Sequence, residues 1–423
     1  MNEMLLHYIW KFRLFNVYNL FTIQGEPVQL INIGTHNTHS GADFQNAKIK
    51  IGDTLWAGNI EMHIQSNDWF VHNHHTDAAY NSVILHVVFE QNGHIAVMQS
   101  GQQIPTLVLK DRINQNTITR FNELEKRKTW IPCQKFFTSN KTFEFENFTR
   151  RLSIERLENK VEDIELLLLQ SDNDWENVLF QMIAKYLGSS INKEPFLQLA
   201  QSLPIYVWAK YQNSLLQLEA LVFGQAGFLN DELDDAYGKE LRKEYNYLKR
   251  LHSLQPAAKH NWKFLRLRPS NFPTLRLAQL AAIMAKHSKF FSTLISTPNV
   301  KFIHYFFDVE VSSYWQHHYQ FDKLVDKANS HLGSSMKNIL LINAVAPVLF
   351  AYGKYKDAEL YCEQAIELLE ACEPEQNAIT KGWQKLGINP VNSFETQALL
   401  QLKNQYCDKF RCLECVIGLG ILK

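Results

Sequence analysis

The stretch GTHNTHSGADFQNAKIKIGDTLWAGNIEMHIQSNDWFVHNHHTDAAYNSVILHVVFE, residues 34–90, decides the fold of the N-terminal part of this chain. Apolar and polar residues alternate over Phe44–Ile51, which is typical of a half-buried strand. Gly52-Asp53 is a hairpin-type turn, and Leu55–Ile64 alternates again. Ser82–Glu90 is an almost continuous apolar run, which is typical of a central strand. These residues therefore predict a sheet built around three strands.

The flanking sequence extends this sheet and then changes character. Asn2–Phe15 has the apolar spacing of a short amphipathic helix, and strand-like runs follow at Tyr18–Gln24 and Val28–Ile33. From Phe143 onward the apolar period is that of helices. We therefore predict an α+β protein: an N-terminal helix and a mixed or antiparallel sheet in residues 1–115, a connecting helix or linker in 116–140, and an all-α domain in 141–423.

Composition limits the class of protein. Of the 423 residues, 46% are hydrophobic, which indicates a folded chain with a sizeable core. Polar residues and prolines interrupt the apolar runs before they reach the roughly 18 residues of a membrane helix. The N-terminus lacks the pattern of a signal peptide, so we expect a cytoplasmic protein without a membrane partner. Six cysteines in such a protein are expected to be reduced thiols or metal ligands.

Two acids in the opening stretch suggest a metal site. Asp43 opens one predicted strand, and Glu61 lies on the next, two residues before His63. Carboxylate oxygens suit Mg²⁺ or Mn²⁺, and a third group can activate the attacking water. We expect Asp43, Glu61 and His63 to be catalytic, with Lys48 or Lys50 on the preceding strand as a substitute cation. The alternative is that Glu61 and His63 form only the solvated face of a half-buried strand.

This arrangement resembles the motif of the PD-(D/E)xK nucleases over roughly the first 100 residues. Ala42-Asp43 stands where that family has Pro-Asp, and His63 stands where a lysine is usual. The resemblance implies a nuclease-like fold and hydrolysis of phosphodiester bonds.

Histidines are concentrated in the same region. Eight of the sixteen lie between His36 and His94. Histidine and carboxylate together suit Zn²⁺, Mn²⁺ or Fe²⁺ better than Mg²⁺. We expect His86, in the central strand, to join Asp43, Glu61 and His63 as a metal ligand. The alternative for a single histidine on an apolar strand is a hydrogen-bonded residue of the core.

Cysteines near the C-terminus suggest a second, structural metal site. Cys407, Cys412 and Cys415 have a spacing that fits zinc or an iron–sulfur cluster, and Cys133 is the candidate for a fourth ligand. One cysteine beside the sheet and three near the C-terminus are similar to the iron–sulfur staple of some PD-(D/E)xK helicase-nucleases, although the spacing differs. The alternative is that the three C-terminal cysteines are small buried residues that pack a terminal helix.

A basic segment suggests contact with nucleic acid. The net charge of the chain is zero, but residues 239–276 contain ten lysines and arginines against two acids. Arg266, Arg268 and Arg276 alternate with apolar and aromatic residues, a pattern that can bind phosphates and stack on bases. The alternative is a solvated helix face followed by a structural loop.

The whole chain also resembles a bacterial family described only as a domain of unknown function. The motifs that carry this resemblance are GADFQNAKIKI, WAGNIEMH, FGQAGFL, RLRPSNFPTLRLAQLA and the terminal YC and CLEC. The residues together predict a metal-dependent nuclease or phosphodiesterase that acts on nucleic acid. The rival hypothesis is a non-catalytic scaffold that binds nucleic acid or protein and keeps a degenerate nuclease-like domain.

Overall fold

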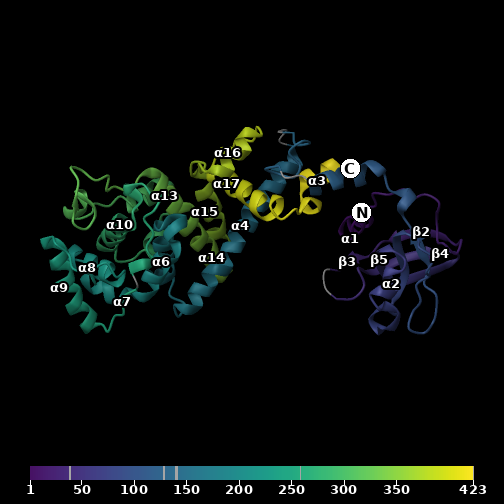
Figure 1. The fold of residues 1–423 in the computed structure, drawn as a ribbon, viewed down its shortest axis with the longest axis horizontal. Coiled ribbons are helices and arrows are strands. Elements are labelled where there is room, and N and C mark those ends of the chain that lie inside the picture. The colour runs from purple at the N-terminus through teal and green to yellow at the C-terminus, as the bar shows by residue number, and fades with distance from the viewer. Residues whose placement is uncertain (38–39, 127–128, 139–141, 258, 423) are drawn as a thin grey trace. The chain divides into compact units, whose positions relative to one another are not determined.

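The computed structural model describes residues 1–37, 40–126, 129–138, 142–257 and 259–422. The chain divides into two compact units, one formed by Met1–Phe145 with Lys403–Lys423 and the other by Glu146–Leu402. The first unit contains the sheet and the second is almost entirely helical (Figure 1). The predicted α+β class, with a mixed N-terminal sheet and a helical region after it, is confirmed.

The first unit is organised around one seven-stranded mixed sheet. Its path runs β1-β2-β4-β5-β6-β7, and β3 pairs with β4. The strands are β1 (Leu20–Phe21), β2 (Pro27–Asn32), β3 (Thr35–His36), β4 (Phe44–Ile51), β5 (Thr54–Gln65), β6 (Val83–Glu90) and β7 (Thr106–Val108). The Ile23 amide, just after β1, donates to the Thr106 carbonyl of β7 over 2.8 Å. The two edges of the sheet therefore meet, and the sheet forms a nearly closed barrel.

The pairing changes direction at β5. The strands from β1 to β5 pair antiparallel, whereas β5 pairs with β6, and β6 with β7, in parallel. A parallel pair needs a crossover, and residues 66–82 provide it. This crossover carries α2 (Asp68–Val71), η1 (His74–Thr76) and η2 (Ala78–Tyr80).

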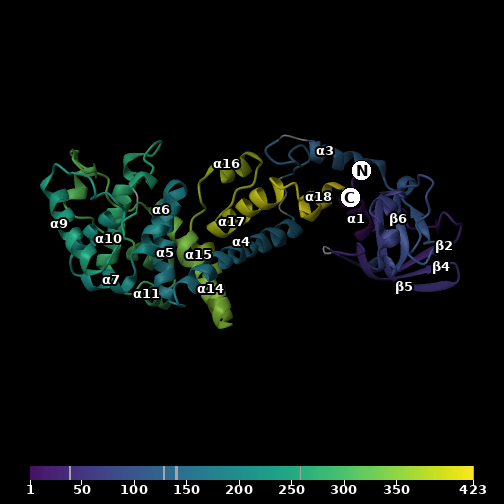
Figure 2. The ribbon, with the colours of Figure 1, turned by 60° about the horizontal axis from the view of Figure 1, so that its bottom comes forward.

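Helices complete the first unit. Helix α1 (Glu3–Lys11) packs on β5 and buries Leu5, Leu6 and Ile9. Helix α3 (Gln115–Lys126) follows the sheet, and the C-terminal α18 (Val416–Leu422) lies beside it (Figure 2). Thr117 Oγ1 donates to the Leu422 carbonyl over 3.2 Å, and the Arg120 guanidinium donates to that of Ile421 over 2.9 Å. The C-terminal segment 403–423, which we predicted as part of the all-α domain, thus groups with the sheet.

The second unit has one continuous apolar core of helices. They are α4 (Phe143–Gln170, which starts in the first unit), α5 (Trp175–Leu187), α6 (Ser189–Ser202), α7 (Ile205–Trp208), α8 (Leu215–Gln225), α9 (Ala236–Leu251), α10 (Pro273–Lys286), α11 (Phe291–Ser296), α12 (Val300–Phe306), α13 (Ser334–Leu340), α14 (Ala346–Lys356), α15 (Glu359–Ala371), α16 (Ala378–Lys385) and α17 (Ser393–Gln401), with a small hairpin of β8 (His318–Gln320) and β9 (Lys323–Leu324). Helix pairs α5–α6, α8–α9, α8–α10 and α14–α15 pack together, and their buried faces form this core.

One helical run of the second unit is apolar enough to cross a membrane. Ser334–Lys356 comprises α13, a π-helical turn at Leu341–Val345 and α14, with a mean hydropathy of 1.4 over its most apolar window. Of that window, 67% is buried inside the protein, and its buried residues belong to the helical core. Burial of this extent is that of a core helix.

Candidate metal centre

The register between β5 and β6 builds one side of the site. Glu61 is the direct partner of His86 in the parallel pair, so both side chains lie on the same face of the sheet. His63, two residues after Glu61, shares that face. All three side chains are buried, with exposed fractions of 5%, 1% and 0% for Glu61, His63 and His86.

The crossover builds the other side. Trp69 of α2 is fully buried, and its ring lies 5.3 Å from the rings of both His74 and His86. Asn73 adopts a left-handed conformation with φ of 62°, which asparagine tolerates better than most residues. This turn separates His72 from His74, and both imidazoles lie against His63, with ring centroids at 5.0 and 5.2 Å. The crossover therefore covers the Glu61 face with histidines.

Three nitrogens and one oxygen converge at this place. The ligand atoms of His63, His72 and His74 all lie within 4.8 Å of one another. His63 Nε2 is 3.1 Å from His72 Nδ1 and 3.7 Å from Glu61 Oε1, and His74 Nε2 is 3.2 Å from the same oxygen. Zinc–ligand bonds of about 2.0–2.1 Å in a tetrahedron imply ligand separations of about 3.3–3.4 Å. The histidine triad can therefore bind a metal ion, with Glu61 beside it.

His86 supports the triad from behind. Its Nε2 lies 2.9 Å from His63 Nδ1, the nitrogen that does not face the other ligands. A metal-binding histidine usually donates its second ring N–H to such a partner, which fixes the tautomer. The geometry thus gives His86 a supporting position next to a ligand, whereas the sequence suggested a ligand.

Burial keeps the central histidines neutral. It lowers the pKa of His63 to about 2, with His86, His74 and His72 adding to the effect, and it lowers the pKa of His86 to about 3. Burial also raises the pKa of the Glu61 carboxyl, an effect that the Asp43 charge increases and the contact with His74 opposes. Neutral imidazoles keep their lone pairs at physiological pH, so the cluster is ready for a cation.

Asp43 forms a second pair at the edge of the cluster. Its Oδ2 accepts from the Met62 amide over 2.9 Å and lies 3.2 Å from His7 Nε2, while its own amide donates to Glu61 Oε2 over 3.1 Å. The side chains of His7 and Asp43 are 19% and 22% exposed, and His72 is exposed. The cluster therefore reaches solvent on this side.

Lys48 lies apart from the cluster. It is exposed on β4 and pairs with Ala57, four residues before Glu61 on β5. At 3.3 Å per residue this is about 13 Å along the strand. Because a lysine side chain is shorter than this distance, Lys48 is badly placed to act at Glu61.

The arginines of the basic segment differ in accessibility. Arg266 and Arg268 are exposed, in the loop before α10. Arg276 is buried inside α10, where its guanidinium donates to Gln279 Oε1 over 2.8 Å and to Asn271 Oδ1 over 2.7 Å. The prediction that Arg276 contacts phosphate therefore needs correction, because its guanidinium is used inside the fold.

The sequence alone did not single out His7, His72 and His74 as parts of one site. The density of histidines in residues 34–90 was the available signal for His72 and His74. For His7 the only signal was its place on the face of an amphipathic helix, which does not reveal a partner on another element.

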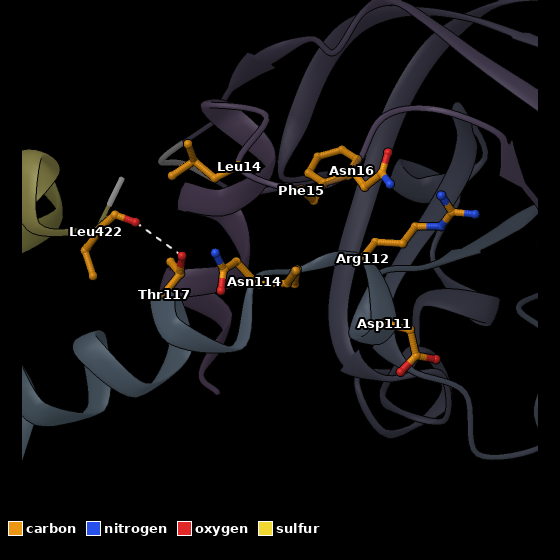
Figure 3. Close-up of a pocket in the computed structure, with 9 residues that line it drawn as sticks. Leu14, Phe15, Asn16, Asp111, Arg112, Asn114, Thr117 and Leu422 are labelled. Atoms are coloured by element: carbon orange, nitrogen blue, oxygen red, sulfur yellow. Dashed lines mark hydrogen bonds between the residues drawn. The ribbon is translucent and has the colours of Figure 1, made fainter.

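A pocket of about 530 Å³ lies elsewhere in the first unit (Figure 3). Its lining includes Phe15, Asp111 and Arg112, and the hydrogen bond from Thr117 to Leu422 crosses its edge. The Arg112 guanidinium donates to the carbonyls of residues 18 and 19 over 3.0 and 2.7 Å. Because the pocket shares no residue with the histidine cluster, it is separate from the candidate centre.

Comparison with known proteins places the chain in a family. Residues 3–378 match the family model described as Protein of unknown function (DUF2851). The chain belongs to this family. The match includes every residue of the histidine cluster and Cys133, and it ends before Cys407, Cys412 and Cys415. No curated protein and no solved structure matches the chain, so the nuclease-like resemblance finds no support in these comparisons.

Proposed function

We propose that this member of the DUF2851 family is a metal-dependent hydrolase that cleaves phosphodiester bonds in nucleic acid. The observation that carries the proposal is the convergence of His63, His72 and His74 with Glu61, on the side of the cluster that reaches solvent. His63, His74 and His86 are buried, and these buried imidazoles are more than a packed core requires, since apolar side chains would fill the same space without unpaired nitrogens.

The donor set indicates which cation is expected. Three imidazole nitrogens and one carboxylate suit Zn²⁺ or Mn²⁺, whereas Mg²⁺ prefers oxygen ligands. Residues His63, His72 and His74 would hold the ion, with Glu61 as a fourth ligand. A zinc ion held by these residues would lower the pKa of a water bound to it to about 7 and so would make that water available for hydrolysis at neutral pH.

Asp43 and His7 are suited to proton transfer beside this ion. Asp43 Oδ2 lies 3.2 Å from His7 Nε2, and both side chains are partly exposed. A carboxylate in this position orients an imidazole, which can then accept a proton from water or return one to the leaving group. We assign the His7–Asp43 pair this role in place of Lys48.

The substrate class rests on charge. A phosphodiester is an anion, and exposed Arg266 and Arg268 belong to a segment with ten basic residues and two acids. Such a segment supports non-specific contact with a phosphate backbone. We infer that the helical unit contributes to binding nucleic acid, while the sheet unit carries the chemistry.

The test is cleavage of labelled single- and double-stranded DNA and RNA in the presence of Zn²⁺, Mn²⁺ or Mg²⁺. We expect Glu61→Gln and His63→Ala to lower the rate by about 10²-fold or more, since each removes part of the catalytic constellation. Lys48→Ala is the matched control on the neighbouring strand and should retain the wild-type rate.

Three results would change the proposal. Cleavage that survives His63→Ala would place the chemistry elsewhere. Loss of cleavage in Lys48→Ala would restore the lysine role expected from the nuclease resemblance. A wild-type protein that binds metal and nucleic acid but cleaves none of these substrates would favour the scaffold hypothesis.

A further inference from the structure

Helix α4 carries two half-buried cations on one face in the helical unit. Arg156 and Lys160 are one turn apart, so their side chains lie on the same side of the helix. Ser153 Oγ, close to them on α4, donates to the Phe394 carbonyl over 2.7 Å, which holds α17 beside α4. The two charges therefore lie inside one compact unit, and none of the residues of the histidine cluster belongs to that unit.

Both cations bind the same neutral oxygen. Arg156 Nε donates to Gln397 Oε1 over 2.6 Å, and Lys160 Nζ donates to the same oxygen over 3.5 Å. The Lys160 ammonium also donates to Asn343 Oδ1 over 3.1 Å and to the Ile342 carbonyl over 3.3 Å. All four bonds end on uncharged acceptors, and in the described part of the chain no carboxylate bonds to either cation.

Glu375 does not neutralise this pair directly. It lies in the connection between α15 and α16, and its carboxylate accepts from the amide nitrogen of Gln397, whose oxygen binds the cations. Burial lowers the pKa of Lys160 to about 7, an effect that Arg156 increases and Glu375 opposes, and burial raises the pKa of Glu375. A close ion pair would shift both pKa values in the opposite directions. The two cations are therefore short of a negative partner.

A π-helical turn holds Lys160 in place. Leu341–Val345 forms this turn between α13 and α14, and two acceptors of the ammonium, the Ile342 carbonyl and the Asn343 side chain, belong to it. Asn343 is itself fixed, since its Nδ2 donates to the Ile339 carbonyl over 3.0 Å. Single π-helical turns inside helices are frequent at functional sites. The lysine is thus positioned by a feature that helix packing alone does not require.

Arg156 keeps its terminal nitrogens free. Within the described residues its hydrogen bond to Gln397 leaves from Nε, and the two terminal nitrogens have no bond to the protein. Neither nitrogen is sealed from solvent. A guanidinium that is anchored through Nε presents a planar fork of donors, which matches the oxygens of an oxyanion.

We propose that Arg156 and Lys160 bind the phosphate group of a small anionic ligand. A carboxylate has two oxygens, and the fork of Arg156 alone would occupy both. A terminal phosphate group has a third oxygen for Lys160, whose contact of 3.5 Å with Gln397 is the longest of its three and the easiest to exchange. The charge of the ligand would then supply the negative partner that the neutral Gln397 cannot. Such binding is independent of the proposed hydrolysis.

The experiment is calorimetric titration of the full-length protein with inorganic phosphate, adenosine monophosphate, adenosine and acetate. A chelator keeps metal-bound phosphate out of the histidine centre, and chloride keeps the ionic strength constant. We expect the wild type to bind one phosphate group per chain. Arg156→Gln should weaken this binding by about tenfold or more, because it removes a charge-assisted bidentate contact.

The matched control is Arg150→Gln. Arg150 lies on the same helix, is exposed and pairs with Glu370 over 3.3 Å. Because its charge already has a carboxylate partner, its replacement should leave the affinity for phosphate unchanged.

A charge-conserving variant keeps the test independent of the folding of Arg156→Gln. Arg156→Lys retains the cation but has no fork, so it should keep the wild-type unfolding midpoint without ligand and lose several-fold in affinity for phosphate. In the wild type, phosphate should raise the midpoint of thermal unfolding above its value in chloride, because a ligand that binds the folded state stabilises it. This rise should be smaller in both Arg156 variants.

The ligands separate the possible sources of the phosphate group. Equal affinity for inorganic phosphate and adenosine monophosphate would support a site for free phosphate. Tighter binding of the monophosphate, without binding of adenosine, would support a site for a phosphate monoester.

Three results would overturn the assignment. A wild type that binds neither phosphate nor the monophosphate would leave the cations as part of the packing of α4 against α17. Unchanged affinity in Arg156→Gln would place the ligand elsewhere. Acetate that binds as tightly as phosphate would contradict the need for a third oxygen. Because the histidine centre takes no part in these readouts, each of these failures leaves the proposed hydrolase untouched.

Discussion

Replacement of His86 by phenylalanine tests how the candidate metal centre is built. His86 is fully buried, and its Nε2 lies 2.9 Å from His63 Nδ1. Phenylalanine keeps an aromatic ring of similar size beside Trp69 but cannot accept a hydrogen bond. The variant therefore removes the support of one ligand and leaves the ligands themselves in place.

The expected size of the effect follows from the tautomer of His63. When Nε2 binds a metal, the proton must stay on Nδ1, where His86→Phe leaves it buried without an acceptor. Such an unsatisfied group costs about 1–3 kcal/mol. In the metal-free protein the proton can move to Nε2, where His72 Nδ1 at 3.1 Å and Glu61 Oε1 at 3.7 Å can accept it. The cost thus falls on the metal-bound state and corresponds to about 5–150-fold weaker binding.

The assay is a Co²⁺ titration of the metal-free protein, followed by absorption and by tryptophan fluorescence. Histidine and carboxylate ligation lacks the intense bands of thiolate ligation, so the spectrum distinguishes the histidine centre from cobalt bound to a cysteine. The control is His94→Ala, which replaces an exposed histidine that follows β6. This variant should bind Co²⁺ as the wild type does.

Two outcomes would refute this reasoning. Unchanged affinity in His86→Phe would show that the bond to His63 does not hold the ligand. A loss of binding equal to that of His63→Ala would show that His86 is itself a ligand, as the sequence suggested.

Three further predictions concern the helical unit. Burial raises the pKa of Glu219 to about 7, so its carboxyl is protonated in the fold between pH 4.5 and 7 while the unfolded chain ionises. The stability that depends on this proton is complete below pH 4.5 and is lost as the pH rises through 7. Glu219→Gln should therefore stabilise the protein at pH 8, by about 3 kcal/mol, and should have little effect at pH 4.5. Urea unfolding at the two pH values measures this, and equal effects at both would contradict it. Gly224→Ala should destabilise the protein by about 1–3 kcal/mol, because the added Cβ would lie 2.1 Å from the Tyr245 ring. A thermal unfolding curve measures this, and an unchanged unfolding midpoint would mean that the ring can move. Arg266→Ala with Arg268→Ala should weaken binding of nucleic acid and reduce the slope of log affinity against log salt by about 2, whereas an unchanged slope would exclude this loop from the interface.

Local patterns predicted most of the fold. The alternation in Phe44–Ile51 and the apolar run before Glu90 were sufficient for β4 and β6, because side-chain period is a property of neighbouring residues. The same patterns put Glu61 and His63 on one face of β5. The predicted N-terminal helix Asn2–Phe15 contains α1, and α3 lies at the start of the predicted connecting segment 116–140.

Local patterns did not show which side chains meet across elements. The sequence suggested His86 as a ligand because it lies in the predicted central strand of a histidine-rich stretch, and Lys48 as a catalytic cation because it lies one strand before Glu61. In the structure the parallel register pairs His86 with Glu61, which lets His86 Nε2 contact His63 Nδ1, and the antiparallel register sets Lys48 opposite Ala57. A register is a pairing of distant residues, and no local period contains it.

The sequence by itself thus determined the class of the fold and pointed to residues 34–90 as the place of a candidate metal site, since composition, period and the density of histidines are readable from the chain. Only the tertiary structure decided which residues act together. The crossover brings His72 and His74 over His63, and helix α1 brings His7 to Asp43. Burial, which tertiary packing alone creates, also withdrew Arg276 from the surface, lowered the pKa of His63 and raised that of Glu61.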